Sequence, residues 1–336
     1  MRKLFMLLSF VSAGAVGYAA DPPYRLVREI AIGGEGGWDY LISDPAAHRL
    51  YVSHATKIVV ADTRTGQLVG EIPDTQGVHG FALAPDLGRG YTSNGRANSS
   101  TIIDLKTLKP LGTVPTGANP DSIRYLPDRK EVWTFNHTGK SITAFEALTG
   151  KVVATIDLGG ELEEAVEDAR ANRVFVNVED KGALGVVDTR THAVVATWPM
   201  AGCEGPTGLT FDAAHHLLLS ACDGKMAVVD STSGKMVTSF PIPDGVDGNG
   251  FDPATGYAFA SSRTGVLVVA HEDAPNKFTI VQRVMTQPSG RTMWLEPTTH
   301  DVYVPVAMTT PGAGGRAQVT PNTMKVLVFG MAGKQP

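Results

Sequence analysis

Basic runs, cysteines and enzyme signature motifs are scarce or missing in this sequence of 336 residues. Proteins that bind nucleic acid through its phosphates concentrate Lys and Arg on one surface, so the lack of any basic run argues against a nucleic-acid partner. The sequence also contains no nucleophile elbow, no phosphate-binding loop and no His-Glu-x-x-His zinc motif. The common motifs of hydrolases and nucleotide-binding proteins therefore assign no activity to this chain.

Long apolar runs are missing after the first twenty residues. A basic start, Arg2-Lys3, precedes the apolar run Leu4–Val11, and small residues follow. This order predicts a secretory signal peptide cleaved after Ala19, which leaves residues 20–336 as the mature protein. The alternative is a retained membrane anchor, but the apolar run is short for a bilayer span. We therefore expect a periplasmic or secreted protein with no membrane span in its mature chain.

The mature chain is acidic and poor in cysteine. Removal of the signal peptide with its two basic residues leaves 27 basic residues against 34 acidic ones, a net charge of −7. Only Cys203 and Cys222 remain as cysteines. In an oxidising compartment, an even pair of cysteines predicts a disulfide, with metal ligation or a free thiol as alternatives.

Convincing helical patterns are also missing, and strand-like segments dominate between turns of Gly, Pro, Asn and Asp. One acidic residue closes every third strand of a repeating unit. Its successive positions are 42 residues apart: Asp62, Asp104, Glu146, Asp188, Asp230 and Glu272. A fixed period in the low forties, with four short strands per unit, is typical of the blades of a β-propeller.

The repeat predicts seven blades and a closed ring. The last unit contains only three strand-like segments before the chain ends, whereas Tyr24–Ile32 lies ahead of the first unit as an additional one. We therefore predict an all-β, seven-bladed β-propeller of four-stranded antiparallel blades, closed by the N-terminal outer strand in the last blade. Residues 308–323 form an insertion in that blade, expected as a surface loop or as a lid over the channel.

Folding each inner strand against the next strand places a ring of polar side chains where the inner strands begin. We call this end of the central channel the mouth. Its predicted members are Asp39, His79, Asp121, Glu163, Glu204, Asp247 and Arg291. An acidic concave site favours a cation, so a small molecule, a metal ion or a peptide is the expected ligand.

Three histidines are predicted on the same face as these carboxylates. His54, His79 and His137 together with Asp or Glu provide the donor atoms that zinc or copper prefers, with His54 expected beside Asp39. The cofactor is not identified by any motif, and a divalent metal ion is the candidate. In a metal-dependent hydrolase or lyase, the candidate catalytic residues would be Glu163, Glu164 and Arg291.

Repetition of Asp and Asn along the blades leaves two interpretations open. The first makes these residues ligand-binding groups at the mouth: Asp39, Asn94, Asp121, Asn136, Glu204 and Asp247. The second gives them a structural role, because a carboxylate at the start of a strand accepts backbone N–H groups and an Asn side chain closes a turn. His79 and Arg291 break the repeat, so a structural role explains them less well.

Three segments resemble the Tyr-Val-Thr-Asn repeat of a known family: Tyr51-Val-Ser-His54, Tyr91-Thr-Ser-Asn94 and Trp133-Thr-Phe-Asn136. The mature chain as a whole resembles the YncE-like, YVTN-type bacterial propellers, although His54 occupies an Asn position. This resemblance implies an exported seven-bladed propeller. Members of that family serve as binding proteins, surface proteins and enzyme-like relatives.

Related propellers include metal-dependent lactonases, lyases and haem-carrying reductase domains. The sequence has no Cys-x-x-Cys-His motif, so covalent haem is not expected. We therefore expect a ligand- or partner-binding protein. The alternatives are a metal-dependent, lactonase-like enzyme acting at the mouth and a scaffold that binds other envelope proteins.

Overall fold

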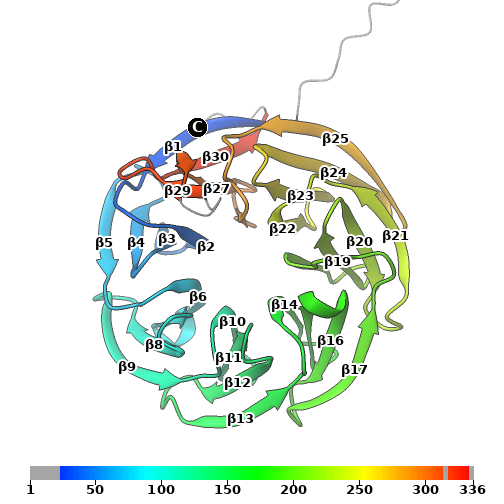
Figure 1. The fold of residues 1–336 in the computed structure, drawn as a ribbon, viewed down its shortest axis with the longest axis horizontal. Helices are drawn as coiled ribbons and strands as arrows, with labels where there is room; N and C mark the ends of the chain where they lie inside the picture. Colours follow the sequence, from blue (N-terminus) through cyan, green and yellow to red (C-terminus); the bar gives the residue numbers. More distant parts are fainter. Residues whose placement is uncertain (1–22, 313–316, 333–336) are drawn as a thin grey trace, which may run out of the picture.

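Short segments rich in Val, Ile and aromatic residues form the strands of this protein, because such side chains pack well on both faces of a pleated sheet. The computed structural model describes residues 23–312 and 317–332. Within them, seven four-stranded antiparallel sheets stand as blades around a central channel (Figure 1). The predicted fold class is confirmed.

The strands follow one another from the channel to the rim in each blade. Blade 1 contains β2 (Trp38–Asp44), β3 (Arg49–His54), β4 (Lys57–Asp62) and β5 (Leu68–Ile72). Blade 2 contains β6 (Val78–Ala84), β7 (Arg89–Asn94), β8 (Ser99–Asp104) and β9 (Lys109–Pro115). Blade 3 contains β10 (Pro120–Leu126), β11 (Glu131–Asn136), β12 (Ser141–Glu146) and β13 (Val152–Asp157). Blade 4 contains β14 (Leu162–Asp168), β15 (Arg173–Val178), β16 (Ala183–Asp188) and β17 (Ala193–Pro199).

The remaining blades keep this order with one exception. Blade 5 contains β18 (Leu209–Asp212), β19 (Leu217–Cys222), β20 (Lys225–Asp230) and β21 (Met236–Pro241). Blade 6 contains β22 (Val246–Asp252), β23 (Tyr257–Ser262), β24 (Val266–Ala274) and β25 (Lys277–Met285). Blade 7 contains β26 (Trp294–Leu295), β27 (Val302–Val306), β30 (Lys325–Met331) and, from the other end of the chain, β1 (Tyr24–Ala31). Two single-turn 3₁₀ helices, η1 (Pro85–Leu87) and η2 (Glu179–Lys181), lie in loops.

Strand β1 closes the ring as predicted. It pairs antiparallel with β30, from Tyr24 opposite Met331 to Ala31 opposite Lys325. The ring of Tyr24 packs edge-on against Phe259 of blade 6, with 4.9 Å between the ring centroids. The first described strand therefore completes blade 7 by pairing with the outer edge of β30, and it also contacts the neighbouring blade.

The core lies between adjacent blades. Tyr51 of blade 1 and Phe81 of blade 2 stack with 4.7 Å between their ring centroids, and Trp133 of blade 3 is fully buried. Such aromatic contacts fix each blade against the next. The inner strands, whose first residues form the mouth, are therefore held at defined positions around the channel.

The acidic residue of the 42-residue repeat stabilises a turn. Asp62 Oδ1 accepts hydrogen bonds from the backbone N–H groups of Arg64 and Thr65, each at 2.9 Å, and Asp230 Oδ1 accepts one from Ser233 at 2.8 Å. A short acidic side chain that accepts backbone N–H groups two and three residues later is an Asx turn. Where the periodic acid is Asp, it is thus part of the scaffold.

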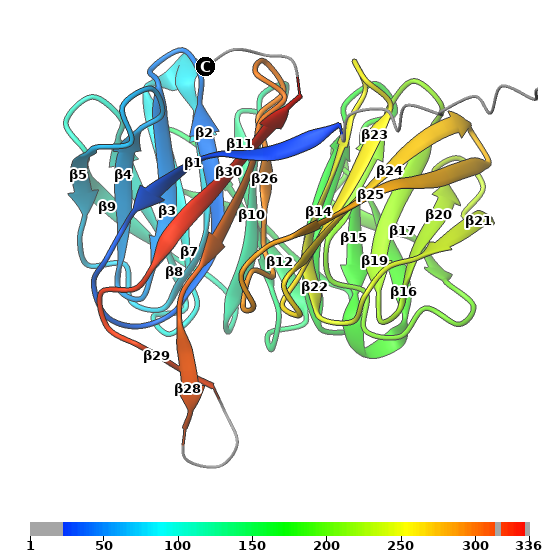
Figure 2. The ribbon, with the colours of Figure 1, turned by 90° about the horizontal axis from the view of Figure 1, so that it is seen from above.

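Two further expectations concern the disulfide and the insertion. Cys203 and Cys222 form a disulfide within blade 5, with Cα atoms 5.2 Å apart, which confirms that prediction. In the insertion, β28 (Thr309–Pro311) pairs with β29 (Ala317–Val319) as a hairpin that projects away from the disc (Figure 2). Asn322, which follows the hairpin, exchanges two hydrogen bonds with Gly34.

The predicted signal peptide, residues 1–19, lies outside the described residues. The described part of the chain has no helix with the length and apolar character that a membrane crossing requires.

Candidate ligand and metal site at the channel mouth

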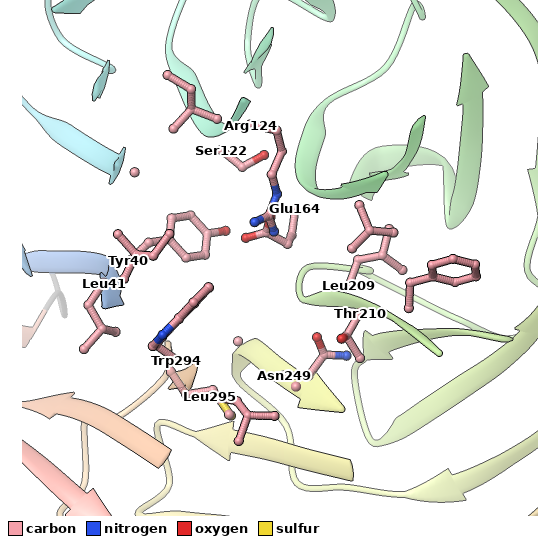
Figure 3. Close-up of a pocket in the computed structure, with 18 of the residues that line it drawn as sticks. Tyr40, Leu41, Ser122, Arg124, Glu164, Leu209, Thr210, Asn249, Trp294 and Leu295 are labelled. Carbon is pink, nitrogen blue, oxygen red and sulfur yellow. The ribbon is translucent and has the colours of Figure 1, made fainter. Parts of the chain in front are cut away.

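Two cavities follow one another along the channel. The mouth encloses a cavity of about 270 Å³, and a larger one of about 440 Å³, the channel cavity, lies beyond it. Tyr40 lines both cavities, and Figure 3 shows its ring projecting toward the channel axis. The mouth cavity is lined by Asp39, Tyr40, His79, Asn119, Asp121, His137, Glu163, Glu179, Thr207, Asp247, Arg263 and Arg291.

Irregular pairing at the beginning of the inner strands directs these side chains toward the mouth. The register shifts between Trp38 and Leu41 in β2 and between Leu162 and Ala165 in β14, and three other inner strands shift at the matching place. A bulge of this kind breaks the strict alternation of side chains. Consecutive residues such as Glu163 and Glu164 can then both face the channel, the first at the mouth and the second in the channel cavity.

The first group of charges in the mouth joins side chains from blades 1, 2, 3, 6 and 7. His79 Nδ1 lies 2.6 Å from Asp39 Oδ2 and 3.1 Å from Asp121 Oδ1. Arg291 forms ion pairs with Asp247 and with Asp39, the latter at 3.5 Å. The carboxylate of Asp39 is thus held between two positively charged or protonatable side chains.

The pKa values within this first group follow from its contacts. Burial alone would lower the pKa of His79, but the hydrogen bond to Asp39 and the charges of Asp121 and Asp39 raise it to about 9. Burial alone would raise the pKa of Asp39, but Arg291 and His79 lower it. His79 and Arg291 therefore neutralise this part of the mouth from within the protein.

The second group joins blades 3 and 4 around His137. Its Nδ1 atom lies 3.0 Å from Glu163 Oε1 and 3.9 Å from Glu179 Oε2, while Nε2 lies 3.8 Å from Glu161. The Nδ1 atom is buried, and its contacts lack hydrogen-bond geometry. In the part of the chain that the structure describes, no Lys or Arg forms an ion pair with Glu163 or Glu179.

The carboxyl groups near the second group are crowded together, which disfavours their charged form. Burial and the neighbouring Glu179 raise the pKa of Glu163 well above its usual value. Burial and Glu163 likewise raise the pKa of Asp121 well above its usual value. The mouth thus divides into a side neutralised by His79 and Arg291 and a side that lacks a fixed cation.

His54 does not join either group. The bulge in β2 places His54 opposite Trp38, so the expected contact between His54 and Asp39 is replaced by the contact between Asp39 and His79. The His54 Nδ1 atom lies 3.1 Å from the carbonyl oxygen of Gly37. Its ring lines a separate cavity beside the outer strand of blade 1 rather than the mouth.

Asn94, Asn136 and Glu204 also lie apart from the mouth cavity. The buried Asn94 amide donates to Thr101 Oγ1 at 2.9 Å, and the buried Asn136 amide donates to Thr143 Oγ1 at 3.0 Å. Each Asn therefore joins the second and third strands of its blade, which matches the structural interpretation. Glu204 is exposed, and Thr207 takes the corresponding place in blade 5.

Two of the three candidate catalytic residues form ion pairs within the protein. Glu164 and Arg124 form an ion pair in the channel cavity, and Figure 3 shows both pointing toward the channel axis near Tyr40. Arg291 contacts Asp247 and Asp39. Of the three candidates, only Glu163 is placed beside a candidate metal ligand, His137.

Sequence reasoning missed Tyr40, Asn119 and Thr207 as residues of the mouth. Tyr40 donates a hydrogen bond to Asp121 Oδ2 at 3.3 Å, although strict alternation after Asp39 would direct it away from the channel. Asn119 and Thr207 precede the first residues of β10 and β18, so they are loop residues without a strand pattern. Only knowledge of the bulges would have identified Tyr40.

Comparisons with known proteins agree on the fold. Over 93% of this chain and 99% of the other, it is similar to a structure of Kuenenia stuttgartiensis hydrazine synthase, with a TM-score of 0.71 and 13% identity. It also resembles U3-55K (TM-score 0.75, 10% identity, 91% and 98% covered) and the RRP9 WD40 repeats (TM-score 0.76, 9% identity, 92% and 97% covered). No protein-family model and no curated sequence matches the chain. At these identities the likeness supports the propeller fold alone, and the YncE-like resemblance stays a prediction.

Proposed function

We propose that this protein is an exported binding propeller whose mouth holds a divalent transition-metal ion through His137, Glu163 and Glu179. The observation that carries the proposal is the buried Nδ1 atom of His137. It makes no hydrogen bond of good geometry with any residue that the structure describes, and carboxylate oxygens of Glu163 and Glu179 lie 3.0 and 3.9 Å away. One imidazole nitrogen and two carboxylate oxygens are donors that zinc accepts.

The contrast between the two groups supports this choice of ligands. In the first group, Arg291 and His79 already occupy the positions where a cation would interact with Asp39. The second group has two partly buried carboxylates, Glu163 and Glu179, and the imidazole of His137. Neither carboxylate has a Lys or Arg partner among the described residues. Close carboxylates without a counter-ion repel one another, and a bound divalent ion would remove that repulsion.

Binding fits the arrangement better than hydrolysis does. A metal-dependent hydrolase needs a group near the metal that accepts a proton from water. Of the two candidates for that role, Glu163 is here a proposed ligand of the metal, and Glu164 forms an ion pair with Arg124 in the channel cavity. We therefore propose that the mouth captures a metal ion, or a ligand that the ion carries, and that export places this site in the cell envelope or outside the cell.

Metal analysis of the purified mature protein tests the proposal. After dialysis with zinc and removal of excess, the wild type should retain zinc at the mouth. His137→Ala and Glu163→Gln should each lower the zinc content by about one ion per chain. His79→Gln is the matched control, because His79 lines the same cavity but belongs to the neutralised group. Equal zinc content in the wild type and His137→Ala would contradict the proposal. Zinc loss in His79→Gln alone would also contradict it, because the ion would then belong to the first group.

A further inference from the structure

A third group, of two carboxylates and one histidine, lies on the face of the disc opposite the mouth. Asp212 is the last residue of β18, and His215 lies in the turn that leads to β19. Glu272 comes from β24 of the neighbouring blade 6. Because β18 begins at the mouth, its last residue and the following turn lie on the other face.

The three side chains converge on one point. His215 Nδ1 lies 2.7 Å from Asp212 Oδ2 and 3.2 Å from Glu272 Oε1. The Asp212 side chain is 2% exposed and the Glu272 side chain is 4% exposed, whereas 46% of the His215 side chain reaches solvent. Glu272 Oε1 is buried and makes no hydrogen bond of good geometry with any described residue.

Other histidines on this face have ordinary partners. His300 Nδ1 lies 2.8 Å from Asp252, and His192 Nε2 lies 2.8 Å from Glu131. Each of these pairs joins one imidazole to one carboxylate across neighbouring blades. At His215, two nearly buried carboxylates from different blades face a single imidazole, and that group has one carboxylate in excess.

We propose that Asp212, His215 and Glu272 form a second divalent-metal site, which fastens blade 5 to blade 6. A protonated imidazole would bring one positive charge between two buried carboxylates, whereas a divalent ion brings two. One nitrogen and two oxygen donors suit zinc, and the exposed side of His215 leaves room for water as a further ligand. The site lies outside the mouth and does not depend on the proposed function.

A zinc titration of four proteins separates this site from the one at the mouth. The wild type should bind two zinc ions, His137→Ala and His215→Ala one each, and the double variant none. His216→Asn is the control for His215→Ala, since it removes the adjacent imidazole and Asn tolerates the positive φ of 57° at that position. Should His215→Ala and the wild type bind the same number of ions, the second site is absent whatever happens at His137.

Thermal melting of His137→Ala gives an independent measurement of the same site. Zinc at about a hundred times its dissociation constant should raise the melting temperature of that variant by roughly 5 °C. Glu272→Gln, added to His137→Ala, should abolish the zinc-dependent rise while melting no lower without metal, because it removes a buried charge. A rise that survives Glu272→Gln, or that is missing in His137→Ala itself, would overturn the proposal.

Discussion

His79 Nδ1 and Asp39 Oδ2 lie 2.6 Å apart and join blade 2 to blade 1 at the mouth. This contact and the charge of Asp121 raise the pKa of His79 to about 9 despite its burial. The unfolded chain has the ordinary value near 6.5, so the charged imidazole stabilises the fold fully below about pH 6.5. That contribution is lost as the pH rises through 9.

We expect His79→Gln to reveal this contribution. At pH 6 the variant should be less stable than the wild type by on the order of 2 kcal/mol, with allowance for the part of the side chain that reaches solvent. At pH 10 the difference should nearly vanish. Urea unfolding in EDTA at both pH values measures it, and a difference that does not depend on pH would contradict the assignment of a raised pKa.

Closure of the ring through β1 predicts unequal effects of two substitutions on one strand. Ile30 is fully buried in blade 7, so Ile30→Ala should cost about 3 kcal/mol of unfolding free energy. Leu26 is 47% exposed, so Leu26→Ala should cost less than about 1 kcal/mol. Deletion of Tyr24–Ala31 should destabilise the whole protein. Equal melting temperatures of the deletion variant and the wild type would exclude closure through β1.

The disulfide between Cys203 and Cys222 should contribute measurably to stability. Closing a loop of this length restricts the unfolded chain by on the order of 3 kcal/mol. A reducing agent should therefore lower the urea midpoint of the wild type but leave Cys203→Ala/Cys222→Ala unchanged. If reduction has no effect on the wild type, the bridge does not contribute to folding.

The sequence predicted the fold because its periodic features are the local determinants of the blades. Asp62 and its equivalents recur every 42 residues, and the four Asp residues among them cap the same turn by accepting backbone N–H groups: Asp62, Asp104, Asp188 and Asp230. The missing strand of the last unit likewise predicted the pairing of β1 with β30. The turns depend on residues that are close together in the chain, and the closure depends on the number of strands in each unit. Both can be read from the sequence alone.

The mouth could be predicted only in part. The starts of the inner strands correctly placed Asp39, His79, Asp121, Glu163, Asp247 and Arg291 around one cavity. The sequence did not show which of them are in contact. Bulges shift the register between the first and second strands of a blade, and no residue type in the inner strands predicts that shift. For this reason His54 lies outside the mouth and Tyr40 lies in it, contrary to prediction. In blade 5, the short strand β18 begins only at Leu209, which leaves Glu204 in an exposed loop.

The ionised form of Glu167 in the channel cavity should destabilise the fold, whereas the charged form of His79 stabilises it. Burial, with the charges of Asp128 and Asp168, raises the pKa of Glu167 to about 7. An acid whose pKa is higher in the folded state than in the unfolded chain destabilises the fold when it is ionised. The cost is absent below about pH 4.5, grows as the pH rises, and is complete above about pH 7.

Glu167→Gln should therefore stabilise the protein at pH 8 and leave it nearly unchanged at pH 4. The gain at pH 8 should be on the order of 1 kcal/mol, because the half-buried carboxylate is partly screened by solvent. Glu35→Gln removes the same charge at an exposed position, so its effect should be small at both pH values. Thermal melting of the three proteins at pH 4 and pH 8 measures the difference. If Glu167→Gln and Glu35→Gln respond alike to pH, burial in the channel does not raise the pKa of Glu167.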